Sequence, residues 1–180
     1  SMTSRWGLLE TWNRITKLGD SEGGSSETKA DWLALKAMTL AGLRDFETTE
    51  HSINEALKLH PDRSWLHVCR AYLLEREDRP EEALQAAEHA LQLRPWYRPA
   101  VQMLAYRQVQ MNQDEDALEL LRTAVARLES GELRIQLAAL LVELRRYEEA
   151  REIYDDLEKY LPLSHLERNQ PEWIAARRAD

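Results

Sequence analysis

Small side chains recur along this chain at a fixed interval of 34 residues. The two clearest series are Ala37, Ala71 and Ala105, and Ala56, Ala90 and Ala124. A repeated interval of this size is typical of stacked helical hairpins, and it constrains the fold more than any local pattern does. Each hairpin leaves an apolar face open, so neighbouring hairpins must stack to cover it. The sequence therefore predicts an all-α solenoid.

Apolar periodicity predicts eight helices in this array. Their expected ranges are 29–42, 47–59, 64–77, 80–93, 98–111, 114–128, 132–144 and 147–160. Pro80 and Pro99 fall in predicted first turns, where the missing N–H would have no partner in any case. Asn112 and Gly131 lie between helices, and we expect both to take a positive φ in tight turns.

A further helix is predicted at the N-terminus, over residues 2–18. Leu8, Trp12 and Ile15 give it an apolar face at helical spacing. The glycine- and serine-rich segment 19–28 is predicted to be a flexible linker with a reach of about 15–20 Å. The helix can therefore fold back, either to cap the first repeat or to occupy a groove of the array.

The repeated pattern resembles the tetratricopeptide repeat (TPR) family. That family has a 34-residue helix–turn–helix unit with a leucine and a small residue in the first helix, and an aromatic residue and two alanines in the second. The fourth repeat matches best, through Leu137, Ala138, Leu141, Tyr147, Ala150, Tyr154, Leu157 and Pro162. Thr49 in place of an alanine, Glu129 in place of a proline and one 33-residue step depart from the pattern.

The resemblance implies a right-handed superhelical solenoid with four full repeats. Their expected ranges are 29–62, 63–96, 97–130 and 131–162. Trp173, Ile174, Arg178 and Ala179 echo the first helix of the second repeat. We therefore expect residues 163–180 to form a linker and the first helix of a truncated fifth repeat, with further chain beyond it.

The charge balance narrows the classes of partner. Acidic residues outnumber basic ones by 32 to 24, for a net charge of −8, which argues against nucleic acid and anionic membranes. The single cysteine, Cys69, excludes an internal disulfide and favours a cytoplasmic location. No apolar run approaches the length of a membrane span.

Catalytic and cofactor motifs are missing from the sequence. The five histidines show no metal-ligand spacing, and no glycine-rich phosphate loop is present. Acidic pairs such as Glu81–Glu82 open second helices, where they favour the helix dipole. The sequence thus predicts a chain that is not an enzyme and binds no cofactor or metal.

The resemblance also implies a peptide-binding groove lined by the first helix of each repeat. The candidate groove residues are Met38, Val68, Tyr72, Arg76, Gln102, Tyr106, Gln110 and Ile135. The alternative, strongest for the valine, is that some of them only fill contacts between helices. A mostly apolar groove of this kind suits an amphipathic helix or an apolar peptide.

One activity known in the family is not expected. A subset of the family grips C-terminal carboxylates of chaperone tails with lysine, asparagine and arginine. The corresponding positions are Ala34, Met38, Cys69, Pro99 and Met103, and none carries a cation or an amide.

The sequence therefore predicts a non-catalytic interaction scaffold for a protein or peptide partner. An alternative is the recruiting arm of a larger enzyme whose catalytic domain follows residue 180. Weak self-association through exposed solenoid ends is a further possibility, because an open end leaves apolar surface uncovered.

Overall fold

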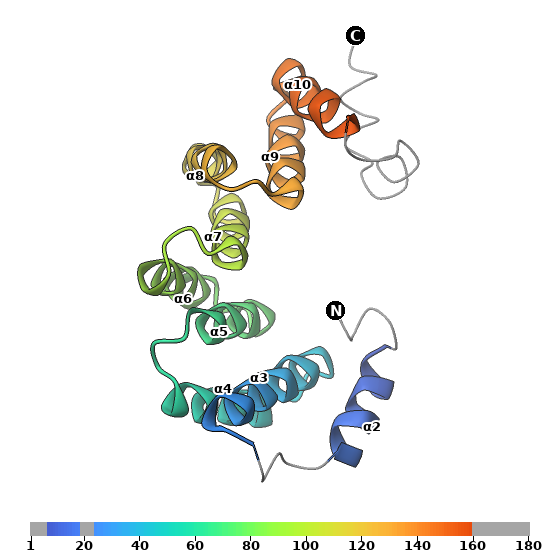
Figure 1. Ribbon diagram of the computed structural model, residues 1–180, viewed down its shortest axis with the longest axis vertical. Helices are drawn as coiled ribbons and strands as arrows, with labels where there is room; N and C mark the ends of the chain where they lie inside the picture. The colour runs from blue at the N-terminus through green and yellow to red at the C-terminus, as the bar shows by residue number, and fades with distance from the viewer. Residues whose placement is uncertain (1–6, 19–23, 160–180) are drawn as a thin grey trace. The chain divides into compact units, whose positions relative to one another are not determined.

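The computed structural model describes residues 7–18 and 24–159, and residues 1–6, 19–23 and 160–180 lie outside it (Figure 1). The described part contains α-helices and no strand. The helices are α2 (Leu8–Leu18), α3 (Ser26–Gly42), α4 (Phe46–Leu59), α5 (Ser64–Arg76), α6 (Pro80–Leu93), α7 (Arg98–Gln110), α8 (Asp114–Arg127), α9 (Gly131–Glu143) and α10 (Tyr147–Glu158). The predicted fifth-repeat helix falls in the part that is not described.

Helix α3 begins earlier than the sequence predicts. The expected linker ran to residue 28, but α3 starts at Ser26. The hydroxyl of Ser25 accepts a hydrogen bond from the Thr28 N–H at 3.2 Å, and Glu27 adds an acidic side chain to the first turn. Both features stabilise a helix N-terminus and account for the earlier start of α3.

The turn between the two helices of each repeat has the same geometry in all four described repeats. A non-glycine residue with φ between 57° and 64° ends each first helix, namely Arg44, Asp78, Asn112 and Arg145. The next residue then donates its N–H to a carbonyl five residues back, as Arg79 does to Leu74 at 3.0 Å. This left-handed C-cap satisfies carbonyls that a helix end would leave unpaired. The prediction for Asn112 is confirmed.

The prediction for Gly131 is wrong. Gly131 is the first residue of α9 and does not take a positive φ. Ser130 caps that helix, because its hydroxyl lies 3.4 Å from the Leu133 N–H. Gly7, just before α2, does take a positive φ, of 76°. Its carbonyl accepts both the N–H and the hydroxyl of Thr11, at 3.1 and 2.8 Å.

The chain divides into two compact units, residues 1–103 and 104–180, with the boundary inside α7. In the first unit, α3 packs against α4 and α5, and α2 packs against α3. In the second unit, α9 packs against α8 and α10. Its most deeply buried side chains include Leu118, Leu121, Leu133, Leu141 and Tyr154.

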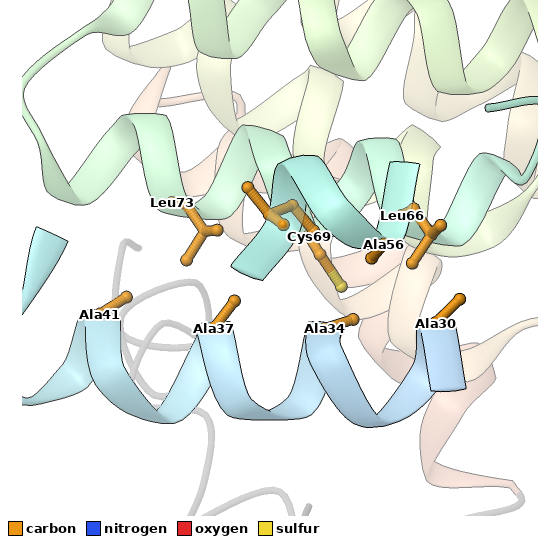
Figure 2. Packing of buried hydrophobic residues seen from close by; sticks show 9 residues of the cluster. Ala30, Ala34, Ala37, Ala41, Ala56, Leu66, Cys69 and Leu73 are labelled. Atoms are coloured by element: carbon orange, nitrogen blue, oxygen red, sulfur yellow. The ribbon is translucent and has the colours of Figure 1, made fainter. Parts of the chain in front are cut away.

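The core of the first unit shows why the small residues repeat. Along α3, every third or fourth residue is a buried alanine that points toward α5 and the end of α4 (Figure 2). These are Ala30, Ala34, Ala37 and Ala41, and they face Ala56, Leu66, Cys69 and Leu73. Helices approach to about 8–10 Å only when the side chains at their contact are small. The period found in the sequence therefore marks the contact lines between helices.

Thr49, which departs from the family pattern, is accommodated without an unpaired polar group. Its side chain is buried, and its hydroxyl lies 2.6 Å from the Asp45 carbonyl and 3.4 Å from that of Ala37. A buried hydroxyl that finds a backbone acceptor costs little. The substitution is therefore compatible with the close contact between α3 and α4.

Candidate functional site

In the first unit, α3 carries the candidate groove residue Met38, and α5 carries Tyr72 and Arg76 as well as Val68. Met38 is half-buried, and its Sδ lies 3.6 Å from the Sγ of Cys69. Burial raises the pKa of the Cys69 thiol to about 12. Cys69 is 1% exposed and is therefore a buried core residue whose thiol is protonated at neutral pH.

Arg76 connects the two helices at this surface. Its Nη1 donates to the Tyr72 hydroxyl at 3.2 Å, and its Nε donates to the carbonyl of Ala41 at 3.3 Å. The guanidinium carbon lies 5.5 Å from the centre of the Tyr72 ring. A cation near the last carbonyls of α3 is also favoured by the helix dipole. The contacts hold an exposed positive charge beside a half-buried tyrosine.

Val68 and Gln102 contribute differently. Val68 is 7% exposed and packs with Ala90 and Ala100, so little of its surface can touch a partner. Gln102 is half-buried on α7. The face that each side chain presents depends on the rotation of its helix, which sequence spacing alone gives only approximately.

The second unit contains a small apolar cavity between α7, α8 and α9. Its volume is about 130 Å³. Aliphatic side chains line it, namely Ala105, Val109, Leu121, Ala139 and Leu140, together with the polar residues Tyr106, Gln110, Gln136 and Glu143. Two candidate residues, Tyr106 and Gln110, thus lie at one cavity, whereas Ile135 is half-buried on α9 and does not line it.

Tyr106 is the most open of the candidate aromatic residues. Its side chain is 43% exposed, which is unusual for a large ring among the described residues. The guanidinium carbon of Arg107 lies 4.7 Å from the ring centre and supports the ring by a cation–π contact. Gln110 and Glu143 are exposed beside it. The cavity therefore has an apolar floor and a polar, partly aromatic edge.

Sequence reasoning did not identify Gln136, Leu121 or Leu140 as cavity residues. Leu121 comes from a second helix, α8, which the register of first helices cannot include. Gln136 and Leu140 lie one helical turn apart on α9, so the same turn that carries Ala139 presents them. The sequence signal that could have identified them is a polar residue, Gln136, placed one helical turn before a leucine, Leu140.

Two of the five positions that correspond to the chaperone-tail clamp are closed to a ligand. Ala34 and Cys69 are each 1% exposed and belong to the helix-contact cluster of the first unit. Neither can reach a ligand without opening the contact between α3 and α5.

Within residues 7–18 and 24–159, no group of three or more His, Cys, Asp or Glu side chains could hold a metal ion. In the same part of the chain, no helix is both long enough and apolar enough to cross a membrane.

Comparison with known proteins identifies the fold. The sequence matches no protein-family model and no curated protein. Among solved structures, TTC0263, a thermophilic TPR protein of Thermus thermophilus, is similar with a TM-score of 0.71 at 16% identity, covering 94% of this chain and 88% of that one. PilF of Pseudomonas aeruginosa gives 0.63 at 18% identity, with 94% and 90% covered.

A third similar structure is YrrB, described as a TPR protein with an unusual peptide-binding site. It gives a TM-score of 0.58 at 18% identity, covering 90% of this chain and 88% of that one. The chain thus has the all-α fold of tetratricopeptide-repeat solenoids, and the fold predicted from the 34-residue period is confirmed.

Proposed function

We propose that this chain is a non-catalytic cytoplasmic scaffold that binds an amphipathic helix or an apolar peptide through the first helices of its repeats. The observation that carries the proposal is the apolar cavity of the second unit, with the exposed ring of Tyr106 at its edge. Repeat solenoids are protein-interaction surfaces, and exposed aromatic rings are enriched where partners bind.

The cavity favours one anchor side chain of modest size. Its volume of about 130 Å³ and its aliphatic lining suit a single leucine, isoleucine or methionine. Gln110 can hydrogen-bond to the backbone of a bound peptide, and the Glu143 carboxylate favours a basic residue next to the anchor. An amphipathic helix presents such a combination on adjacent turns.

The surface formed by Met38, Tyr72 and Arg76 supports the same proposal. Arg76 is held by Tyr72 and by the Ala41 carbonyl, so its charge is fixed before a partner arrives. Preorganised groups lose less conformational entropy on binding. Peptide binding by YrrB, a structure of the same fold, is consistent with this role.

Peptides selected from a displayed random library on the wild-type protein provide the test. We expect Tyr106→Ala to weaken their binding by about tenfold or more, measured by fluorescence polarisation, because the ring supplies contact area at the cavity. Leu59→Ala is the matched control, since Leu59 is also an exposed hydrophobic residue but lies on α4. Equal affinity for wild type and Tyr106→Ala would refute the assignment of this cavity.

We further propose that α2 caps the array. Leu73 of α5 packs against the preceding hairpin. Thr39 of α3 stands 34 residues earlier in the same register and is 0% exposed, although the described chain has no earlier repeat to cover it. Three of the described helices pack against α3, namely α4, α5 and α2 (Figure 1). Because α4 and α5 belong to the repeats, α2 is the helix that stands where an earlier repeat would.

Deletion of residues 1–18 separates a cap from a groove-binding segment. For a cap, we expect lower stability and concentration-dependent association by light scattering, because the deletion exposes the face of α3 that carries Thr39. Tighter binding of library peptides with unchanged stability would instead show that α2 competes for the groove.

A further inference from the structure

A second cavity, in the first unit, is lined by none of the candidate groove residues. Its volume is about 550 Å³, and it opens at the N-terminal end of α5. Aromatic and aliphatic walls are supplied by Trp65, Tyr97 and Leu93. Two arginines, Arg63 and Arg94, and two aspartates, Asp31 and Asp62, also line it.

Arg63 is one of the two arginines and is only partly satisfied. Its Nη2 donates to the Asp31 carboxylate at 3.1 Å. Its Nη1 is buried and has no hydrogen-bond partner. A buried N–H group without an acceptor is unfavourable, and an incoming oxygen atom relieves that cost.

Arg94, the second arginine, is exposed at the end of α6. Its guanidinium carbon lies 4.8 Å from the centre of the Tyr97 ring. Among the residues that the structure describes, it forms no ion pair. Stacking fixes the plane of the guanidinium and leaves its N–H edge available to an oxyanion.

The start of α5 adds backbone donors to the same wall. No side chain caps this helix, because Arg63 stands at the N-cap and the Ser64 hydroxyl donates instead to the Ala90 carbonyl at 2.7 Å. The first N–H groups of a helix, here those of Ser64 and Trp65, have no acceptor within the helix. Both residues line the cavity.

We infer that this cavity binds one carboxylate group, the side chain of a glutamate or aspartate in a partner peptide. The carboxylate accepts hydrogen bonds from Arg63 Nη1 and from the free edge of Arg94, and the side-chain methylenes contact Trp65 and Leu93. Arginine pairs suit this ligand because guanidinium and carboxylate are planar and complementary. The site is separate from the groove, and a free peptide can test it without a groove partner.

The charge of the chain favours a carboxylate over a phosphate. Arg63 and Arg94 carry two positive charges, and Asp31 and Asp62 carry two negative ones in the same cavity. These four charges cancel, and their attraction and repulsion both double for a dianion, so they do not separate a carboxylate from a phosphate. The chain's net charge of −8 repels a dianion more strongly than a monoanion.

Three short peptides in a nuclear magnetic resonance titration test the inference. The probes are acetyl-Ala-Glu-Ala-amide, its glutamine analogue and its phosphoserine analogue, at constant ionic strength. The reporters are the backbone amides of Ser64 and Trp65 and the indole N–H of Trp65. We expect saturable shifts with the glutamate peptide and binding at least about tenfold weaker with the neutral glutamine peptide.

Variants at two stacked arginines locate the site. Arg94→Gln should weaken glutamate-peptide binding by about fivefold or more, because it removes the charge-assisted donor. Arg44→Gln is the matched control, since Arg44 is also exposed and lies 5.4 Å over an aromatic ring, that of Phe46, outside the cavity. Its affinity should stay at the wild-type value.

Several outcomes overturn the inference. Equal affinity for the glutamate and glutamine peptides would show that the negative charge of the carboxylate does not contribute to binding. Tighter binding of the phosphoserine peptide shows that the site prefers a dianion. An unchanged affinity in Arg94→Gln, with a circular dichroism spectrum like that of wild type, places any carboxylate elsewhere.

Discussion

Gly42, near the end of α3, provides a direct test of how α2 is seated. A Cβ built on Gly42 would lie 2.7 Å from Cδ2 and 2.9 Å from Cδ1 of Leu8. Both distances are shorter than van der Waals contact, so Gly42→Ala forces the end of the Leu8 side chain to shift and loosens the contact of α2 with α3. The change adds a single methyl group, which leaves the contacts of α3 with α4 and α5 in place.

Two opposing terms set the size of the effect. Overpacking costs about 1–3 kcal/mol, and the flexible Leu8 side chain places the cost near the lower end of this range. Alanine stabilises a helical position by about 0.5–1 kcal/mol relative to glycine. We therefore expect Gly42→Ala to be neutral to about 1 kcal/mol destabilising. In a Leu8→Ala background the clash is absent, and the same change should stabilise by about 0.5–1 kcal/mol.

Urea unfolding of the four proteins in this cycle measures the coupling, which should be about 1 kcal/mol. Hydrogen exchange adds a local measurement, because only the amides of α2 should lose protection in Gly42→Ala. Thr11 is the most informative amide, since its N–H is bonded to the Gly7 carbonyl and its side chain is buried. If Gly42→Ala has the same effect with leucine or alanine at residue 8, α2 is not seated on Gly42 and the capping argument fails.

Three further predictions concern stability. Asp78→Gly should raise the free energy of unfolding, measured in urea, by up to about 1 kcal/mol, because Asp78 holds a φ of 57° that glycine adopts freely. A lower free energy of unfolding in this variant would refute the C-cap assignment. Leu73→Ala should lower the free energy of unfolding by about 2–5 kcal/mol, because Leu73 is 2% exposed in the contact between α5 and α3. A decrease of less than about 1 kcal/mol would contradict that packing. Burial lowers the pKa of His67 below its usual value of 6.5, so the unfolded chain binds more protons than the folded chain as the pH falls through 6.5. Stability should therefore decrease with acidification in that window, and less so in His67→Gln; parallel pH profiles for the two proteins would argue against it.

The helices and their pairing were predictable because they follow from local and periodic signals. Ala37, Ala71 and Ala105 mark contact lines at a constant interval, and prolines mark first turns. The start of α3 was missed because Ser25 and Thr28 look like linker residues until they form a cap. Gly131 was misread because glycine is common both in turns and at helix starts.

For the candidate site, sequence register placed Tyr106 and Gln110 at one cavity but could not show what else lines it. Leu121 reaches the cavity from another helix, and Val68 turns toward Ala90 and Ala100. Such contacts depend on how each helix is rotated and how far it lies from its neighbours. A repeat period predicts only the average of these quantities over the repeats. The link from Arg76 to the Ala41 carbonyl crosses 35 residues and has no sequence signature.

The sequence by itself thus determined the class of fold, because small residues recur at a nearly constant spacing along the hairpins, and only stacking of the hairpins can bury their apolar faces. The tertiary structure decided the particular surfaces. It seats α2 beside Gly42, joins Arg76 to Ala41, and brings Arg63 and Arg94 together at one cavity. These features arise where the repeats differ from one another, and a period describes only what the repeats share.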